Sequence, residues 1–248
     1  MKVVIISAGS ATRLGDYTKE LPKGLLDING KSILERQILL FKKFEISDIT
    51  IITGPHSEKY NFTDVSYVHD DEYQEHDVLG SLMASRKLLN DDLIISYSDI
   101  LFDENIFKPI LNCQEDIGVA VDLEWEESYK NRTLHPKEQA DSVLIQNDKI
   151  VKIKKNISTL KENEVGEFIG LMKLSKKGAY VFLQKYKKLE KSHKGAFHEA
   201  ASLKKAYLTD MLQELIDSKI KVTPIIIKGN WCEVDTYQDL ESARKKFK

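Results

Sequence analysis

Apolar residues in the first hundred positions follow two alternating patterns. Between short β-branched runs lie stretches such as residues 32–44 and 80–89, in which apolar residues recur three and four positions apart. This spacing is typical of helices that pack on a core. Strands that are apolar on both sides and alternate with helices predict a parallel sheet covered on both faces. The predicted strands are Val3–Ile6, Ile49–Thr53, Val65–Val68 and Leu93–Tyr97.

Two local signals predict where elements begin and turn. Ser32 precedes the helical pattern of residues 32–44, and Glu35 follows three residues later, which is the spacing of a capping box. Asn147 and Asp148 separate two alternating runs within residues 140–157 and predict the turn of a β-hairpin.

The pattern changes after residue 101, where strands come to dominate before helices return. We therefore expect an α/β fold that is Rossmann-like, with a mixed, mostly parallel central sheet, helices on both faces and an inserted β segment. No linker rich in Pro, Gly or Ser divides the chain, so residues 1–248 are expected to form a single domain with halves at about 1–101 and 102–248. The later predicted strands are residues 116–125, 166–174, 221–228 and 231–235, and the later helices are residues 175–190, 208–220 and 236–247.

The composition excludes several classes of protein. Hydrophobic residues make up 42% and charged residues 31% of the 248 positions, as in ordinary globular proteins, and the net charge of −2 argues against nucleic acid as a partner. The two cysteines, Cys113 and Cys232, lie far apart and predict neither a zinc site nor a disulfide framework. No signal-peptide pattern or apolar run of roughly 18 residues is visible, so we expect a cytoplasmic protein without membrane contact.

The segment from Ile6 to Leu26 follows the first predicted strand and carries candidate phosphate-binding residues. Ligands of α/β sheets bind at the loops that leave the carboxyl ends of strands. Ala8 and Gly9 allow close approach to the backbone, while Arg13 offers a planar fork for phosphate oxygens. Lys23 adds a point charge whose position is restricted by Pro22. The alternative is a solvated loop with two surface cations.

Neither of the two commonest phosphate-loop motifs is present here. The segment does not end in Gly-Lys-Ser/Thr, and it lacks the G-x-G-x-x-G pattern. A P-loop kinase and a nicotinamide-dependent dehydrogenase therefore lose their main support.

Two aspartates follow predicted strands in distant parts of the chain. Asp99 ends the run of residues 93–97 and Asp235 follows the short run of residues 231–234. Together they could hold Mg²⁺, or Mn²⁺, beside a nucleoside triphosphate. Alternatively, Asp235 caps the final helix and Asp99 is a turn residue. Combined with Arg13 and Lys23, the four side chains favour nucleotidyl transfer, in which charge neutralisation and positioning dominate.

Residues 8–38, AGSATRLGDYTKELPKGLLDINGKSILERQI, resemble the signature of the sugar-1-phosphate nucleotidyltransferase superfamily: an A-G-x-x-x-R loop, a P-K step and a G-K-x-[IL]-[IL] step. Longer segments resemble its cytidylyltransferase branch, whose members act on phosphonates, phosphocholine or phosphoglutamine. These segments are YSDILF, WEESYKNRTLHP, GEFIGLMKLS, GAFHEAASLKKAYLTDMLQELID and WCEVDTYQDLE. The resemblance implies a nucleotide-diphospho-sugar transferase type of fold, a nucleotide-binding half before residue 102 and an acceptor-binding half after it.

The resemblance also implies roles for individual residues. Arg13, Lys23 and Lys155 are expected to be catalytic, although the register of the second lysine is open among Lys152, Lys154 and Lys155. Asp99 and Asp235 are expected to bind the metal ion. The residues expected to bind the nucleotide are Ala8, Gly9, Ser10, Gly80 and Ser81.

The acceptor-binding prediction rests on two segments of the second half. In the first, Arg132 and His135 are expected near a phosphate or phosphonate, with a plain surface arginine as the alternative for Arg132. In the second, Glu199 and Asp210 are expected to meet an acceptor amine and His198 to contact the ligand. The stronger alternative for Asp210 is a helix cap.

The sequence thus predicts an enzyme that transfers CMP from CTP to a small phosphonate or phosphate-type acceptor, such as 2-aminoethylphosphonate or L-glutamine phosphate in capsular phosphoramidate synthesis, and releases pyrophosphate. One alternative is a sugar-1-phosphate nucleotidyltransferase that uses UTP, dTTP or GTP. Another is a nucleotide-binding regulatory module without catalysis. The sequence does not decide which acceptor is used, and it does not decide between a monomer and a homo-oligomer.

Overall fold

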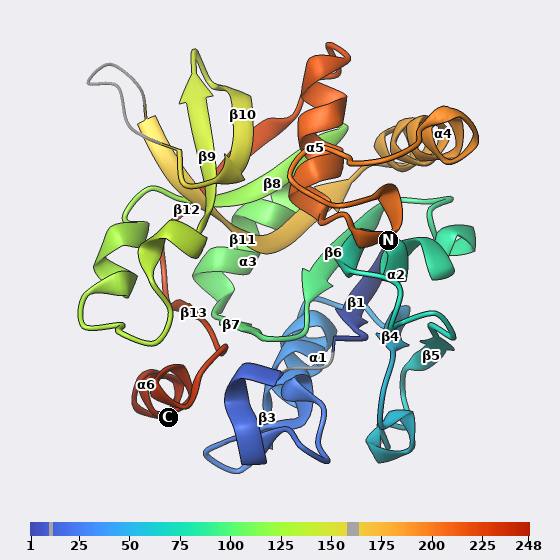
Figure 1. The fold of residues 1–248 in the computed structure, drawn as a ribbon. Coiled ribbons are helices and arrows are strands. Elements are labelled where there is room, and N and C mark those ends of the chain that lie inside the picture. Colours follow the sequence, from blue (N-terminus) through green and yellow to red (C-terminus); the bar gives the residue numbers. More distant parts are fainter. Residues whose placement is uncertain (10–11, 158–163) are drawn as a thin grey trace.

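The structure is a computed structural model that describes residues 1–9, 12–157 and 164–248 (Figure 1). Its strands are β1 (Lys2–Ser7), β2 (Asp27–Ile28), β3 (Lys31–Ser32), β4 (Ile49–Thr53), β5 (Ser66–His69), β6 (Leu93–Tyr97), β7 (Ile100–Phe102), β8 (Ile117–Asp122), β9 (Asp141–Gln146), β10 (Lys149–Lys155), β11 (Glu164–Leu174), β12 (Thr223–Ile227) and β13 (Trp231–Glu233). Its α-helices are α1 (Ile33–Lys43), α2 (Val78–Ala84), α3 (Glu104–Asn112), α4 (Lys176–Ser192), α5 (Leu208–Asp217) and α6 (Tyr237–Lys246).

The central sheet is mixed, as predicted. Its main path runs β10-β9-β11-β6-β1-β4-β5, and β8 pairs with both β11 and β12. The pairs β6–β1, β1–β4 and β4–β5 are parallel, whereas β11 is antiparallel to β6, β8 and β9. The first hundred residues therefore contribute to this sheet only parallel pairs among themselves, whereas the later strands add the antiparallel pairs of β8, β9, β10 and β11 and one parallel pair, β12 with β8.

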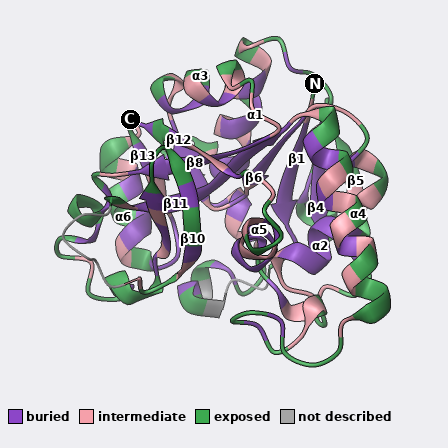
Figure 2. Cartoon of the chain, turned by 90° about the horizontal axis from the view of Figure 1, so that it is seen from above, coloured by how far each residue is buried: buried purple, intermediate pink, exposed green. Residues whose placement is uncertain are grey.

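Helices cover both faces of this sheet, which confirms the prediction made from strands that are apolar on both sides. Val4 and Ile6 of β1 pack in a core with α2, α4 and α5. Val3 and Ile5, which point the other way, pack in a second core with α1 and α3. Figure 2 shows the buried strands between these two groups of helices.

Helix α1 begins where the sequence predicted and also supports a distant strand end. The Ser32 hydroxyl accepts a hydrogen bond from the Glu35 backbone N–H at 3.1 Å, which caps the helix. On the next turn, the buried Gln37 amide donates to the carbonyl oxygens of Tyr97 at 2.9 Å and Ile100 at 2.7 Å. Because these two carbonyls flank the turn after β6, Gln37 fixes the position of the residues within that turn.

The predicted hairpin is formed by β9 and β10. Asn147 and Asp148 have φ values of 49° and 58°, the conformation of a type I′ turn, which matches the twist of the two strands. The resulting register places Asp141, at the start of β9, opposite Lys155, at the end of β10. Two charged residues 14 positions apart in sequence are thus neighbours at one end of the hairpin.

Strand β11 changes partner along its length. Residues 164–167 pair with β9, residues 171–174 pair with β6, and the register with β8 shifts between Phe168 and Met172. Gly170 lies in this irregular stretch with a φ of 78°, and a Cβ there would lie 2.4 Å from the Tyr97 ring. Glycine is required because the backbone is left-handed and because it passes so close to the tyrosine.

None of the helices among the described residues combines the length and the apolar character needed to cross a membrane.

Gly178, in the first turn of α4, lies where this helix packs closely against the backbone of Asp116. A Cβ at this position would lie 1.8 Å from the Asp116 carbonyl oxygen. Alanine is favoured over glycine in a helix by about 1 kcal/mol, but a backbone clash costs about 1–3 kcal/mol or more, so the clash dominates. We predict that Gly178→Ala lowers the free energy of unfolding and the melting temperature, measured by calorimetry.

The control is Gly9→Ala, because a Cβ at Gly9 meets nothing within 4 Å among the described residues. Its free energy of unfolding should stay within about 0.5 kcal/mol of wild type. Equal stability of Gly178→Ala and wild type would contradict the packing described for α4.

Candidate active site

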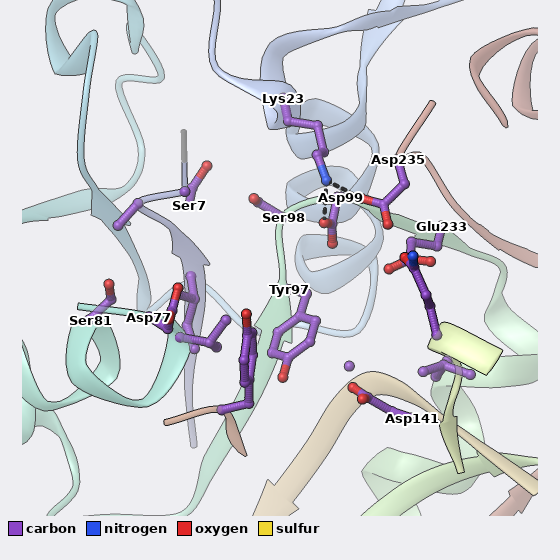
Figure 3. Close-up of a pocket in the computed structure, with 18 of the residues that line it drawn as sticks. Ser7, Lys23, Asp77, Ser81, Tyr97, Ser98, Asp99, Asp141, Glu233 and Asp235 are labelled. Carbon is purple, nitrogen blue, oxygen red and sulfur yellow. Dashed lines mark hydrogen bonds and ion pairs between the residues drawn. The ribbon is translucent and has the colours of Figure 1, made fainter. Parts of the chain in front are cut away.

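A cavity of about 510 Å³ opens at the carboxyl ends of β1 and β6. Residues from both halves of the chain line it, and ten of them are labelled in Figure 3. They include the first loop (Ser7, Ala8, Gly9, Arg13, Lys23), the segment of α2 (Asp77, Val78, Ser81), the end of β6 (Tyr97, Ser98, Asp99) and later residues (Tyr129, His135, Gln139, Asp141, Lys155, Glu167, Phe168, Ile169, Gly170, Tyr207, Trp231, Glu233, Asp235).

Lys23 lies between the two predicted metal-binding aspartates. Its Nζ is 2.9 Å from Asp99 Oδ2 and 2.5 Å from Asp235 Oδ1 (Figure 3). Pro22, with a φ of −55°, precedes it and begins a tight 3₁₀ turn over Lys23–Leu25. Burial lowers the pKa of Lys23, but the two carboxylates raise it further, so the net pKa is above its usual value. The side chain is therefore a fixed cation.

Backbone pairing explains why Asp99 and Asp235 meet. Strand β13 pairs antiparallel with β7, and the Val234 N–H donates to the Asp99 carbonyl oxygen at 2.9 Å. This places the residue after β6 beside the residue after β13. The alternative role of Asp235 as a helix cap is taken by Thr236, whose hydroxyl accepts from the Asp239 N–H, so the Asp235 carboxylate faces the cavity.

Three cationic or hydrogen-bonding groups surround the Asp235 carboxylate. Arg13 lies 2.9 Å from Oδ2 and His135 Nδ1 lies 2.9 Å from the same oxygen, in addition to Lys23 on Oδ1. Burial raises the pKa of Asp235, but the His135 hydrogen bond and Lys23 outweigh it, so the net pKa falls well below the usual range. Asp235 is a permanent anion at every physiological pH.

The first loop forms one side of the cavity, where the sequence predicts that the nucleotide binds. Ala8 and Gly9 line it, and the Ala8 backbone passes so close to Gly54 that a Cβ there would lie 2.4 Å from the Ala8 carbonyl oxygen. Ser81 also lines the cavity, and its hydroxyl donates to the buried Asp70 at 2.8 Å. Gly80 packs against the His76 ring and is not part of the lining, while Ser10 lies outside the described residues.

The predicted acceptor residues separate into two groups. His135 and Lys155 line the cavity, and Lys155 is the member of the Lys152, Lys154 and Lys155 group that does so. Its ammonium lies 5.3 Å from the centre of the Tyr207 ring. Arg132 does not line the cavity, because its guanidinium is paired with Asp239 at 2.6 Å and Glu233 at 3.2 Å.

Within the segment of residues 198–210, Lys205 and Tyr207 line the cavity, whereas His198, Glu199 and Asp210 are not among the lining residues. His198 Nε2 pairs with Glu214 at 3.0 Å, and Glu199 is exposed. The Asp210 carboxylate accepts hydrogen bonds from the backbone N–H groups of Glu199 at 3.1 Å and Tyr207 at 2.8 Å, which caps α5. The capping alternative given by the sequence is thus the one observed for Asp210.

Sequence reasoning missed four acidic residues that line the cavity: Asp77, Asp141, Glu167 and Glu233. Burial raises the pKa of Asp141 to about 6 and that of Glu167 to about 8, against the opposing effects of Lys155 and of Tyr129. Burial and the nearby Asp235 also raise the pKa of Glu233. A signal was available for Glu167, since a lone carboxylate interrupts the otherwise apolar run of residues 165–172.

One group of side chains in the described part of the chain has the geometry to hold a metal ion. It consists of His135, Glu233 and Asp235, whose ligand atoms lie within 4.8 Å of one another. Asp235 belongs both to this group and to the pair with Asp99. A cation held by either of these two groups would therefore contact Asp235.

Comparisons with known proteins agree with this geometry. The family model of the MobA-like NTP transferase domain matches residues 3–151. The CTP:phosphoglutamine cytidylyltransferase of Campylobacter jejuni is 26% identical over 97% of this chain and 98% of its own length. The choline-phosphate cytidylyltransferase of Streptococcus pneumoniae is 33% identical over 44% of this chain and 48% of its own length.

Solved structures confirm the predicted type of fold. The CTP:phosphocholine cytidylyltransferase from Streptococcus pneumoniae superposes with a TM-score of 0.77 at 21% identity, covering 100% of this chain and 99% of its own. The inositol-1-phosphate CTP transferase from T. maritima gives a TM-score of 0.73 at 18% identity, covering 99% of this chain and 96% of its own. With the family model spanning more than half of the 248 residues, the chain belongs to the MobA-like NTP transferase family and is a nucleotidyltransferase.

Proposed function

We propose that this enzyme transfers CMP from CTP to a small phosphonate or phosphate-type acceptor and releases pyrophosphate. The observation that carries the proposal is the position of Lys23 between Asp99 and Asp235, beside Arg13, in a cavity that begins at the Ala8–Gly9 loop. This is a site built for a polyanion that arrives with a cation. We expect the enzyme to carry out this reaction in the cytoplasm.

In the proposed reaction an anionic oxygen of the acceptor attacks the α-phosphorus of CTP. A new P–O bond forms, the bond from the α-phosphorus to the oxygen that bridges it to the β-phosphate breaks, and that oxygen leaves with pyrophosphate. The nucleophile is already ionised, so no general base is required. The main task of the protein is to offset the repulsion between two anions and to align them.

Three cationic side chains on the cavity wall suit this task. Lys23 and Arg13 lie at the first loop, where they are placed to bind triphosphate oxygens. Lys155 lines the acceptor side and is held against the Tyr207 ring. When the triphosphate binds, its oxygens compete with the aspartates for the Lys23 ammonium, which frees carboxylate oxygens.

The freed carboxylates fit a divalent cation. Asp99 Oδ1 is buried without a hydrogen-bond partner among the described residues, and Lys23 already places positive charge between Asp99 and Asp235. Oxygen donors of this kind suit Mg²⁺ or Mn²⁺. Asp99 and Asp235 would hold the ion, with His135 and Glu233 close to Asp235. When bound, it would neutralise charge that develops on the phosphate oxygens.

The choice of CTP is supported by the names of the relatives and structural neighbours, several of which use CTP. The choice of acceptor is supported by the full-length similarity to the phosphoglutamine enzyme of Campylobacter jejuni. A role in capsular phosphoramidate synthesis would follow from that acceptor. The second candidate, a sugar-1-phosphate nucleotidyltransferase that uses UTP, dTTP or GTP, is supported by the uridylyltransferase of Haloferax volcanii, 21% identical over 52% of this chain.

The experiment that decides between the two measures pyrophosphate release with CTP, UTP, GTP and dTTP. Each nucleotide is combined with 2-aminoethylphosphonate, L-glutamine phosphate and glucose-1-phosphate in the presence of Mg²⁺ or Mn²⁺. We expect turnover with CTP and one of the first two acceptors. Preferred use of UTP with the hexose phosphate would reject the proposal, and phosphorus NMR would identify the product.

The metal assignment predicts that Asp99→Asn and Asp235→Asn each lower kcat by about 100-fold or more, because each removes an anionic ligand of the cation that would offset the charge of the crowded phosphates. Both variants are assayed for pyrophosphate release over a range of Mg²⁺ concentrations. Asp64→Asn is the control, since Asp64 is an exposed residue paired with Lys42. Full activity of both aspartate variants would show that the metal is not held by these residues.

The triphosphate role of Lys23 predicts that Lys23→Ala raises the KM for CTP by about 10–100-fold, the effect of losing a hydrogen bond from a charged donor. The same variant leaves Asp99 and Asp235 as neighbouring buried anions, so its melting temperature should also fall. Lys31→Ala, at an exposed lysine of β3, is the control. An unchanged KM with a lowered melting temperature would assign Lys23 a structural role.

A further inference from the structure

Two acidic side chains on the cavity wall have no part in the proposed transfer. Glu167, on β11, is 4% exposed, and its Oε2 has no hydrogen-bond partner among the described residues. Asp141, at the start of β9, has a buried Oδ1 that likewise lacks a partner there. Both residues line the cavity. The Tyr97 hydroxyl, a third buried group without a partner, lies on the same side of the pocket as Asp141 in Figure 3.

These carboxylates are unfavourable for the folded protein unless something binds them. An unpaired carboxylate loses its hydration on burial and receives nothing in return. Tyr129 donates to Glu167 Oε1 at 2.5 Å, which leaves Oε2 without a donor. Lys155 lies opposite Asp141 in register and its charge lowers the pKa of that carboxyl group, but Asp141 Oδ1 still lacks a hydrogen-bond partner among the described residues. Because both carboxylates lie on the wall of a cavity, their position indicates that a bound ligand donates the missing hydrogen bonds.

The donors that these oxygens lack define the chemistry of that ligand. The oxygens need N–H or O–H groups, and burial of two carboxylates favours a positive charge. Aromatic side chains at the same wall, among them Tyr97, Tyr129 and Trp231, add ring faces that attract a cation. A primary ammonium supplies three N–H donors and a charge. A quaternary ammonium has no N–H donor, and a hydroxyl has one donor and no charge, so neither satisfies the site.

We propose that the acceptor carries a primary ammonium group, which Glu167 and Asp141 bind at the wall of the cavity away from the first loop. The inference rests on the proposed function, since it names the class of acceptor used by the same site. Lys155, opposite Asp141, is placed to bind the anionic end of the acceptor. The acceptor is thus a zwitterion, with its anion toward the nucleotide and its ammonium toward β11. This assignment replaces Glu199 and Asp210, which lie outside the cavity lining.

Two matched pairs of acceptors test the inference on the wild-type enzyme with CTP and Mg²⁺. In the first pair, 2-aminoethylphosphonate differs from 2-hydroxyethylphosphonate at the terminal group. In the second pair, O-phosphoethanolamine differs from phosphocholine in its N-methyl groups. We expect kcat/KM to be at least about 100-fold higher for the amine of the first pair and at least about 10-fold higher for the primary amine of the second.

Variants of Glu167 and Asp141 test whether these two residues produce the preference for an amino acceptor. Glu167→Gln and Asp141→Asn should each raise the KM for the amino acceptor by at least about 10-fold. Each should also reduce the ratio of kcat/KM between the amino acceptor and its hydroxyl analogue, while the KM for CTP stays unchanged. Glu164→Gln is the matched control, because Glu164 is an exposed carboxylate on the same strand. Unchanged discrimination in both variants would overturn the assignment of these residues.

Thermal stability separates ligand binding from a structural role for Glu167. Its raised pKa means that ionisation destabilises the fold increasingly as the pH rises from the unfolded value of about 4.3 through about 8. Glu167→Gln should therefore raise the melting temperature of the ligand-free protein at pH 9, whereas loss of a structural carboxylate would lower it. The charged or titratable groups around Glu167 are Tyr129, Arg132, Asp141 and Asp122.

The outcomes distinguish this inference from the proposed function. Turnover with CTP that is equal for amino, hydroxyl and quaternary acceptors would overturn the inference and leave the proposed function intact. A preference for amino acceptors with a nucleotide other than CTP would support the inference and overturn the proposed use of CTP. If no acceptor is turned over, calorimetric titration decides: tighter binding of 2-aminoethylphosphonate than of 2-hydroxyethylphosphonate supports the inference, and equal or undetectable binding of the two overturns it.

Discussion

The ammonium group of Lys23 between Asp99 and Asp235 is the interaction on which the rest of the site depends. Two carboxylates brought this close together repel each other strongly unless a cation separates them. In the ligand-free protein that cation belongs to the chain itself. In the reaction that we propose, the triphosphate would bind the lysine while a divalent ion would bind the two carboxylates. Stability without ligand and affinity for ligand would then arise from the same three charges.

The sheet supplies the two walls that this charge cluster needs. Its parallel strands β1 and β6 end at the first loop and at Asp99, which form the nucleotide side. The antiparallel strand β11 crosses the back of the cavity, where the irregular stretch around Gly170 lets it leave β9 and join β6. The first wall therefore carries Arg13 and Lys23 paired with aspartates, and the other carries the carboxylates of Asp141 and Glu167. A zwitterionic acceptor between them would be oriented by both ends.

The similarity to known proteins is distributed unevenly over these walls. The family model ends at residue 151, so it includes Lys23 and Asp99 but neither Glu167 nor Asp235. The choline-phosphate cytidylyltransferase of Streptococcus pneumoniae likewise matches less than half of this chain. The part of the chain that the family model matches thus contains one of the two proposed metal ligands, while the other lies beyond it. A fold shared at TM-score 0.77 therefore leaves the acceptor to be settled by individual side chains.

The sequence by itself determined the elements and the identity of the charged residues at the nucleotide side, because periodicity, capping and turn chemistry act over a few residues. The strands of the parallel half, the cap at Ser32 and the turn at Asn147–Asp148 were all predicted in this way. Tertiary structure decided which charges meet. Lys23 and Asp235 are 212 positions apart, and their contact depends on the pairing of β7 with β13. Long-range packing likewise turned Arg132 toward Asp239 and brought Asp141 and Glu167 to the cavity wall. No short-range pattern encodes such distances, because they follow from how strands far apart in sequence are aligned.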